Sequence, residues 1–76
     1  MIHIDDFQIS LRAARVNAGL TVINAAKEIG IGKDTLLKWE KNSALVNPIF
    51  QDKISKAYGI PVDRIFFGIQ LERKSS

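Results

Sequence analysis

The chain of 76 residues contains no cysteine, a single histidine and no long apolar run. The absence of cysteine excludes disulfides, thiolate zinc sites and cysteine catalysis. One histidine is too few for a His-rich metal site, and its being His3 argues against a Ser-His-Asp triad built around an ordered core. No segment approaches the roughly 20 apolar residues that a membrane-spanning helix needs. Residues 1–6 lack the basic start of a signal peptide, so we expect a cytoplasmic protein.

What is present is the composition of an ordinary globular domain, with 46% hydrophobic and 25% charged residues. A chain of this length builds one compact core, so we expect a single domain over residues 1–76. The net charge is +3, and the basic excess is largest over residues 11–41, which carry six basic and three acidic side chains. This excess favours an acidic partner for that segment. The sequence has no evident nucleophile–base pair or metal-binding cluster, which argues against an enzyme and against a bound cofactor.

Start and stop signals divide the chain into five expected helices, over about 6–18, 22–29, 33–41, 48–58 and 61–66. The start signals are N-capping side chains and prolines at the first helical position: Asp5 or Asp6, Thr21, Asn47-Pro48 and Pro61. The stop signals are residues that tolerate left-handed backbone: Gly19, Gly30, Asn42, Gly59 and Gly68. The sequence therefore predicts an all-α fold. Residues 2–4 and 67–71 are candidates for a short β-strand at each terminus.

The segment from Val22 to Lys41 has the pattern of a helix-turn-helix. A small residue, Ala26, stands where the two helices would cross, and Gly30 supplies the positive φ that a tight turn needs. The polar side chains of the second helix fall on its outer face, where a recognition helix meets the major groove of DNA. These outer-face residues are Lys33, Asp34, Thr35 and Lys38.

The chain resembles the phage repressor and Cro family of helix-turn-helix regulators, often called the XRE family, in the stretches LRAARVNAGLTVINAAKEIGIGKDTLLKWEK and NPIFQDKISKAYGIPVDRIF. The likeness covers about residues 8–67 and implies a compact five-helix, lambda-repressor-like domain that binds DNA. It also implies that Arg15 and Glu40 form a partly buried ion pair, which ties the first helix to the recognition helix. Three of the four outer-face residues, all except Thr35, match positions from which relatives read bases.

Some positions depart from the family pattern. Val22 stands where relatives commonly carry a glutamine that contacts DNA, and Leu37 replaces a usually polar residue. The loop over residues 41–47 is a little long and apolar, whereas its family counterpart is often basic. These departures favour an alternative function, a protein-interaction module such as an antitoxin or a phage accessory protein, with or without DNA binding.

The expected site residues also have structural explanations. The two outer-face lysines can be solvated charges, and Asp34 can stabilise the first helical turn through the helix dipole. The candidates for phosphate contacts are Arg12, Thr21, Lys41, Asn42 and Ser43. Of these, Thr21 is first of all a helix cap, and a helix-ending turn explains Asn42 equally well. Trp39 follows Leu36 at helical spacing, so we expect it in the core and not stacked on a base.

The prediction is therefore a sequence-specific transcriptional regulator, most simply a repressor, that places helix 33–41 in the major groove of double-stranded DNA. It needs no cofactor and no metal. Because one small module offers little contact area, we expect a homodimer on a two-fold-related site. The first candidate for the dimer interface is the C-terminal tail, residues 66–71, and the second is the apolar loop segment 44–46.

Overall fold

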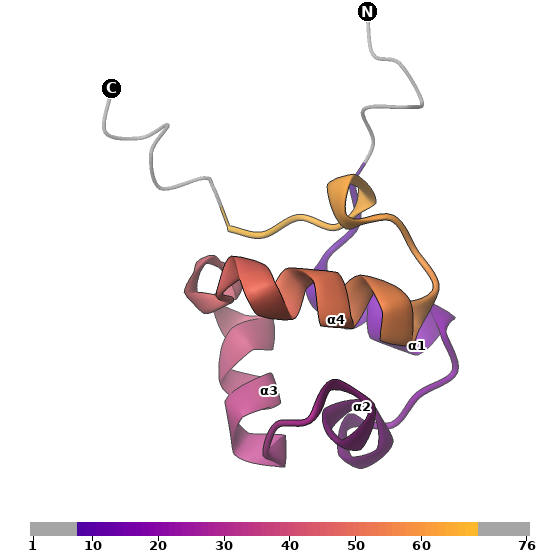
Figure 1. The fold of residues 1–76 in the computed structure, drawn as a ribbon, viewed down its shortest axis with the longest axis vertical. Helices are drawn as coiled ribbons and strands as arrows, with labels where there is room; N and C mark the ends of the chain where they lie inside the picture. The colour runs from indigo at the N-terminus through magenta and orange to yellow at the C-terminus, as the bar shows by residue number, and fades with distance from the viewer. Residues whose placement is uncertain (1–7, 69–76) are drawn as a thin grey trace, which may run out of the picture.

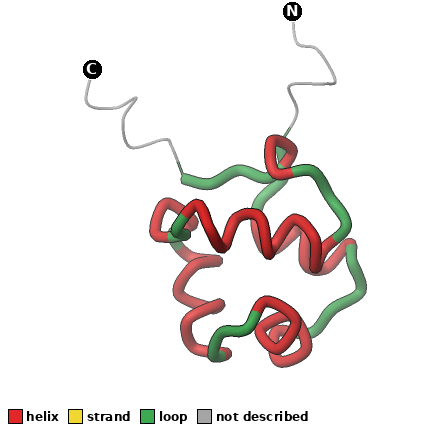
Figure 2. Tube along the Cα trace, in the orientation of Figure 1, coloured by secondary structure: helices red, strands yellow, loops and turns green. Residues whose placement is uncertain are grey.

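The computed structural model describes residues 8–68. That part of the chain forms the α-helices α1 (Leu11–Asn17), α2 (Val22–Ile29), α3 (Lys33–Lys41) and α4 (Pro48–Tyr58). It also forms two single 3₁₀ turns, η2 (Ser43–Leu45) and η3 (Val62–Arg64). Figure 2 shows short loops between these elements and no strand within the described residues. The expected all-α architecture is confirmed for this part of the chain.

Local signals set the ends of α2 and α4 where the sequence indicated. Thr21 and Asn47 each cap a helix, because a side-chain oxygen accepts a hydrogen bond from a backbone N–H of the first turn. Gly30 closes α2 with a φ of 91°, a left-handed geometry that residues with a side chain rarely adopt. The structure confirms three of the expected helices over their whole ranges, 22–29, 33–41 and 48–58.

The first helix begins later than the sequence indicated. The expected helix covered about 6–18, but α1 starts at Leu11. Ser10 caps it, since its hydroxyl oxygen accepts a backbone hydrogen bond of 3.0 Å from the first turn. Asp5 and Asp6, which were expected to cap this helix, lie outside the described residues. The expected start was therefore wrong, and a serine inside the expected helix supplies the cap.

Residues 61–66 do not form the expected fifth helix. Only the turn η3 forms there, and Ile65 then pairs with Ile9 in an isolated parallel β-bridge. Two backbone hydrogen bonds hold this bridge, from Ile9 N–H to Arg64 O at 2.9 Å and from Phe66 N–H to Ile9 O at 2.8 Å. Ile65 is also almost fully buried. The extended backbone that this long-range pairing requires is incompatible with a continuing helix, and it corrects the expectation of five helices.

The expected terminal strands fall almost wholly outside the described residues, since only Phe67 and Gly68 of the segments 2–4 and 67–71 are described. Neither of these two residues has a strand pairing. Gly68, with a φ of 58°, lies so close to Ala44 that an added Cβ would overlap the backbone there. The C-terminal part of the described chain therefore packs on the loop that follows α3.

The four helices surround one core. α2 packs against α3 and α4, and α1 packs against the same two helices. In Figure 1, α4 crosses the middle of the molecule, with α2 on one side of it and both ends of the described chain on the other. The buried apolar side chains are Leu11, Ala14, Ala25, Ala26, Ile29, Leu36, Trp39, Val46, Ile54, Tyr58 and Ile65. Val46 of the loop segment 44–46 is one of them, whereas Leu45 beside it is exposed.

Candidate nucleic-acid interface

The helix-turn-helix consists of α2, the turn at residues 30–32 and α3. Ala25 and Ala26 are 0% and 3% exposed, so small side chains let the neighbouring helices approach α2 closely. The N–H groups of Gly30 and Ile31 both donate to the carbonyl oxygen of Ala26, at 2.8 and 2.9 Å. These bonds close the turn and fix the direction in which α3 leaves it.

α3 has a polar outer face and an apolar inner face. All four outer-face residues are exposed: Lys33, Asp34, Thr35 and Lys38. On the inner face Leu36 is fully buried, and Trp39 is 8% exposed with its ring 5.4 Å from that of Phe50. Trp39 therefore belongs to the core and is not available for stacking on a base. Asp34 lies in the first turn, where the helix dipole favours a carboxylate, so it stabilises α3 whether or not it meets a base.

Arg15 of α1 and Glu40 of α3 form an ion pair that joins the two helices. Arg15 Nε lies 2.7 Å from Glu40 Oε2, and Arg15 Nη2 lies 3.4 Å from Oε1. Arg15 Nη1 also donates to the carbonyl oxygen of Leu20 at 3.0 Å. The two charged side chains are only 10% and 7% exposed. Such a pair adds little net stability, but its two-point geometry fixes the orientation of α3 against α1.

Tyr58 of α4 lies close enough to this pair to respond to both charges. Its hydroxyl is buried and has no hydrogen-bond partner among the described residues. Burial, and secondly the negative charge of Glu40, raise the pKa of Tyr58 to about 12, while the positive charge of Arg15 acts in the opposite direction. Sequence reasoning did not single out Tyr58. Its one signal was its position four residues after Ile54, on the buried side of α4.

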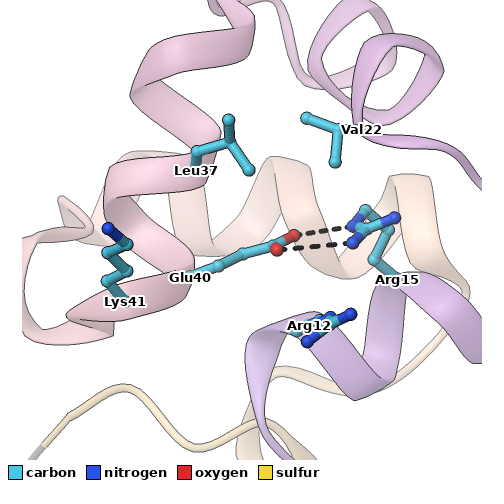
Figure 3. A pocket seen from close by; sticks show the side chains of 6 residues that line it. All are labelled: Arg12, Arg15, Val22, Leu37, Glu40 and Lys41. Carbon is cyan, nitrogen blue, oxygen red and sulfur yellow. Dashed lines mark hydrogen bonds and ion pairs between the residues drawn. The ribbon is translucent and has the colours of Figure 1, made fainter.

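A hollow of about 360 Å³ lies between the two helices of the helix-turn-helix and α1. It is lined by Arg12, Arg15, Val22, Leu37, Glu40 and Lys41. Figure 3 shows Leu37 and Val22 facing each other, with the Arg15–Glu40 pair next to them and with Arg12 and Lys41 at the other edges. Sequence reasoning noticed Val22 and Leu37 separately, but not that the fold brings them together. The spacing of three residues between Leu37 and Glu40 was the available signal, because it places both on one side of α3.

Two residues expected at phosphates, Arg12 and Lys41, line this hollow from α1 and from the end of α3. Both are exposed, so their charged groups remain accessible. Thr21 stands at the start of α2, and its hydroxyl oxygen accepts a hydrogen bond of 3.1 Å from the N–H of Asn24. Thr21 is thus a cap in the structure, and its hydroxyl hydrogen remains available as a donor.

The other two expected phosphate contacts, Asn42 and Ser43, are engaged in the loop after α3. Asn42 Oδ1 accepts from the N–H of Ala44 at 3.2 Å, and the φ of Asn42 is −144°, which is not the left-handed geometry expected at this position. The hydroxyl of Ser43 donates to the carbonyl oxygen of Phe66 at 3.0 Å. The hydroxyl hydrogen that a phosphate would accept from Ser43 is therefore already used within the fold.

Residues 8–68 hold neither a cluster of metal ligands nor a membrane-spanning helix. No group of three or more histidine, cysteine, aspartate or glutamate side chains in this part of the chain is arranged to hold a metal ion. None of its helices combines the length and the apolar character of a membrane span.

A short helix, a tight turn and a second helix with a charged outer face define a helix-turn-helix protein. A sequence model of the helix-turn-helix family matches residues 11–65, most of the chain, so the protein belongs to that family, in its XRE-type branch. The helix-turn-helix of this family is a DNA-binding regulatory domain. No curated protein and no solved structure matches the chain.

Proposed function

We propose that this protein is a sequence-specific, double-stranded-DNA-binding transcriptional regulator that places α3 in the major groove. The observation that carries the proposal is the division of α3 into two faces. Its inner face is fixed by burial of Leu36 and by the Glu40–Arg15 pair, while its outer face presents exposed charged and polar side chains. A helix held rigidly on one side and free on the other is what base recognition in the major groove requires.

The exposed outer face offers chemistry for reading bases. Lys33 and Lys38 carry ammonium donors that match guanine O6 and N7. Asp34 has carboxylate acceptors for cytosine N4, and the methyl group of Thr35 can contact the methyl group of thymine. We assign direct base contacts to these four residues.

Phosphate contacts would set the position of α3 on the duplex. Arg12 and Lys41 supply positive charge at the edges of the hollow, and Thr21 supplies a hydroxyl donor at the start of α2. Asn42 retains its side-chain NH₂ group as a donor, since its oxygen is used in the turn. Ser43 is the weakest of the expected phosphate contacts, because its hydroxyl hydrogen is given to Phe66 O.

By occupying its site the protein would exclude competing proteins, so repression is the regulatory outcome we propose.

The test is selection of bound duplexes from a random-sequence pool at low salt, followed by fluorescence anisotropy. One enriched sequence should bind more tightly than a scrambled duplex of equal composition. Its affinity should fall linearly on a log–log plot against salt, because each phosphate contact releases counterions. The absence of binding to any duplex at low salt would overturn the proposal.

We also propose that the protein acts as a homodimer. Leu45 and Ile49, at the corner between α3 and α4, are 51% and 68% exposed, so two large apolar side chains are available there for a second copy to cover. Phe66 and Phe67, part of the expected tail interface, are already half-buried within the monomer. A two-fold dimer would place two recognition helices one turn of DNA apart, about 34 Å, on a palindromic site.

Two changes separate the candidate interfaces. Truncation after Gly68 removes residues 69–76 and keeps every described contact of the fold, whereas Leu45→Ser combined with Ile49→Ser alters only the exposed corner. Sedimentation should show a dimer for the full chain and a monomer for one of the two variants. A full chain that is monomeric and binds no duplex would favour the second function, a module that binds another protein through this same corner.

A further inference from the structure

The hollow beside the ion pair has an apolar wall, formed by Leu37 and Val22. Leu37 is 40% exposed, although it stands next to the fully buried Leu36 on α3. It falls in one helical row with Lys33 and Lys41, four residues away on either side. Val22, half-buried at the start of α2, faces it across the hollow (Figure 3).

The charges around this apolar wall are of two kinds. Arg15 and Glu40 bond to each other, so neither needs a further partner from outside. Arg12 and Lys41 are exposed at the edges, and neither has an acidic partner within residues 8–68. The hollow therefore combines an apolar surface with flanking positive charge. This suits a ligand that carries a small apolar group between anionic groups.

We propose that Leu37 and Val22 receive the C5-methyl group of a thymine in the major groove, with Arg12 and Lys41 on the flanking phosphates. Leu37 is then a specificity-determining residue. The proposal rests on the proposed function and adds one base preference to it. In the major groove thymine alone of the four standard bases presents a methyl group, whereas the other base edges present polar groups that an apolar wall cannot satisfy. The flanking cations select a nucleic acid as the occupant, because phosphates border each base on the duplex.

The experiment removes the methyl group and nothing else. Duplexes enriched from the random pool are resynthesised with uracil in place of each thymine in turn, which preserves base pairing. Wild-type protein should lose about fourfold in affinity at one thymine position, the value expected for one buried methyl group. Leu37→Ala should bind the thymine duplex more weakly than wild type and should not distinguish uracil from thymine at that position.

Val16→Ala is the matched control, since Val16 of α1 is also about half exposed but lies outside the hollow. It should keep the full thymine preference. Circular dichroism of Leu37→Ala verifies that the helices form. Val22→Ala, which changes the α2 side of the hollow, should also reduce the thymine preference.

The outcomes separate this inference from the function on which it rests. If no duplex is enriched or bound, the proposed function fails. If an enriched duplex binds specifically but uracil at every position is neutral, DNA binding stands and the thymine contact is overturned. Persistence of the thymine preference in both Leu37→Ala and Val22→Ala would likewise overturn it, because the methyl group would then be read elsewhere.

Discussion

The inner and outer sides of α3 differ in what holds them. On the inner side Leu36 is fully buried and Glu40 is bonded to Arg15, so each side chain has one environment that fixes it. On the outer side Lys38 is exposed, and Leu37, at the edge between the two sides, is 40% exposed. The inner side determines whether α3 is held in place, and the outer side is free to determine what it recognises. Substitutions on α3 should therefore separate into those that change stability and those that change binding.

The largest effect is expected on the inner side, at the ion pair. Glu40→Ala leaves Arg15 buried, with the carbonyl oxygen of Leu20 as its remaining bonded partner among the described residues. We expect a loss of about 3–5 kcal/mol in the free energy of unfolding, because an uncompensated charge would stay away from water. Urea denaturation monitored by circular dichroism measures this loss.

Lys56→Ala is the control for Glu40→Ala, since Lys56 is an exposed charge on α4 and its removal should change stability by about 0.5 kcal/mol or less. Equal midpoints for Glu40→Ala and Lys56→Ala would show that the Arg15–Glu40 pair is hydrated in solution. In that case the pair would behave like an exposed ion pair and would contribute little to the free energy of unfolding.

Two adjacent leucines test the boundary between the two sides directly. Leu36→Ala removes a fully buried side chain and should cost about 2–5 kcal/mol in the free energy of unfolding. Leu37→Ala removes a 40% exposed one and should cost about 1 kcal/mol or less. Thermal and denaturant unfolding of the two variants provide the comparison. Similar losses would mean that α3 is rotated in solution relative to the structure.

A smaller effect, on binding alone, is expected on the outer side. Lys38→Ala should weaken binding to the selected duplex by about 1–3 kcal/mol and leave unfolding unchanged, because the side chain is exposed. Anisotropy titrations on the selected and on a random duplex measure it, with Lys56→Ala as the control for loss of one charge. Equal losses on both duplexes would reassign Lys38 to a phosphate, and no loss on either would remove it from the interface.

The parts of the fold that follow from neighbouring residues were predictable from the sequence. α2 and α4 begin after side chains that cap their own first turn, Thr21 and Asn47, and Gly30 ends α2 by its own backbone freedom. The two faces of α3 follow from helical spacing in the same way. Such signals act within about one helical turn, so sequence alone carries them.

The features that local sequence patterns did not indicate depend on contacts between residues far apart in the chain. Ile9 and Ile65 pair across almost the whole described length, and the extended backbone of this pairing is incompatible with a fifth helix. The hollow likewise needs Val22 and Leu37 from different helices, and no local pattern indicates that they face each other. The ion pair of Arg15 and Glu40 is equally long-range, and only the family resemblance pointed to it.

The smallest effect at neutral pH is expected for Tyr58→Phe, where α4 meets the inner side of α3. Removing a buried hydroxyl that has no hydrogen-bond partner among the described residues also removes its desolvation cost, while the ring stays in the core. We expect the free energy of unfolding at pH 7 to remain within about 1 kcal/mol of wild type, or to rise. A much larger loss would mean that the hydroxyl is hydrogen-bonded in solution.

The same variant should differ from wild type at alkaline pH. The pKa of Tyr58 is raised from 10.0 to about 12 in the folded protein, so between these values the unfolded chain releases a proton that the folded protein retains. The stability that this group contributes is therefore fully present below the unfolded pKa and is lost as pH rises toward the folded one, by at most about 1.4 kcal/mol per pH unit.

Phenylalanine has no proton to release, so Tyr58→Phe should lose less stability over this window. Every other ionisable group is common to both proteins, so its contribution cancels in the difference. Urea denaturation of both proteins from about pH 8 to about pH 11 measures that difference. Parallel pH profiles would show that the hydroxyl of Tyr58 is hydrated and that the inner side of α3 is open to water at this point.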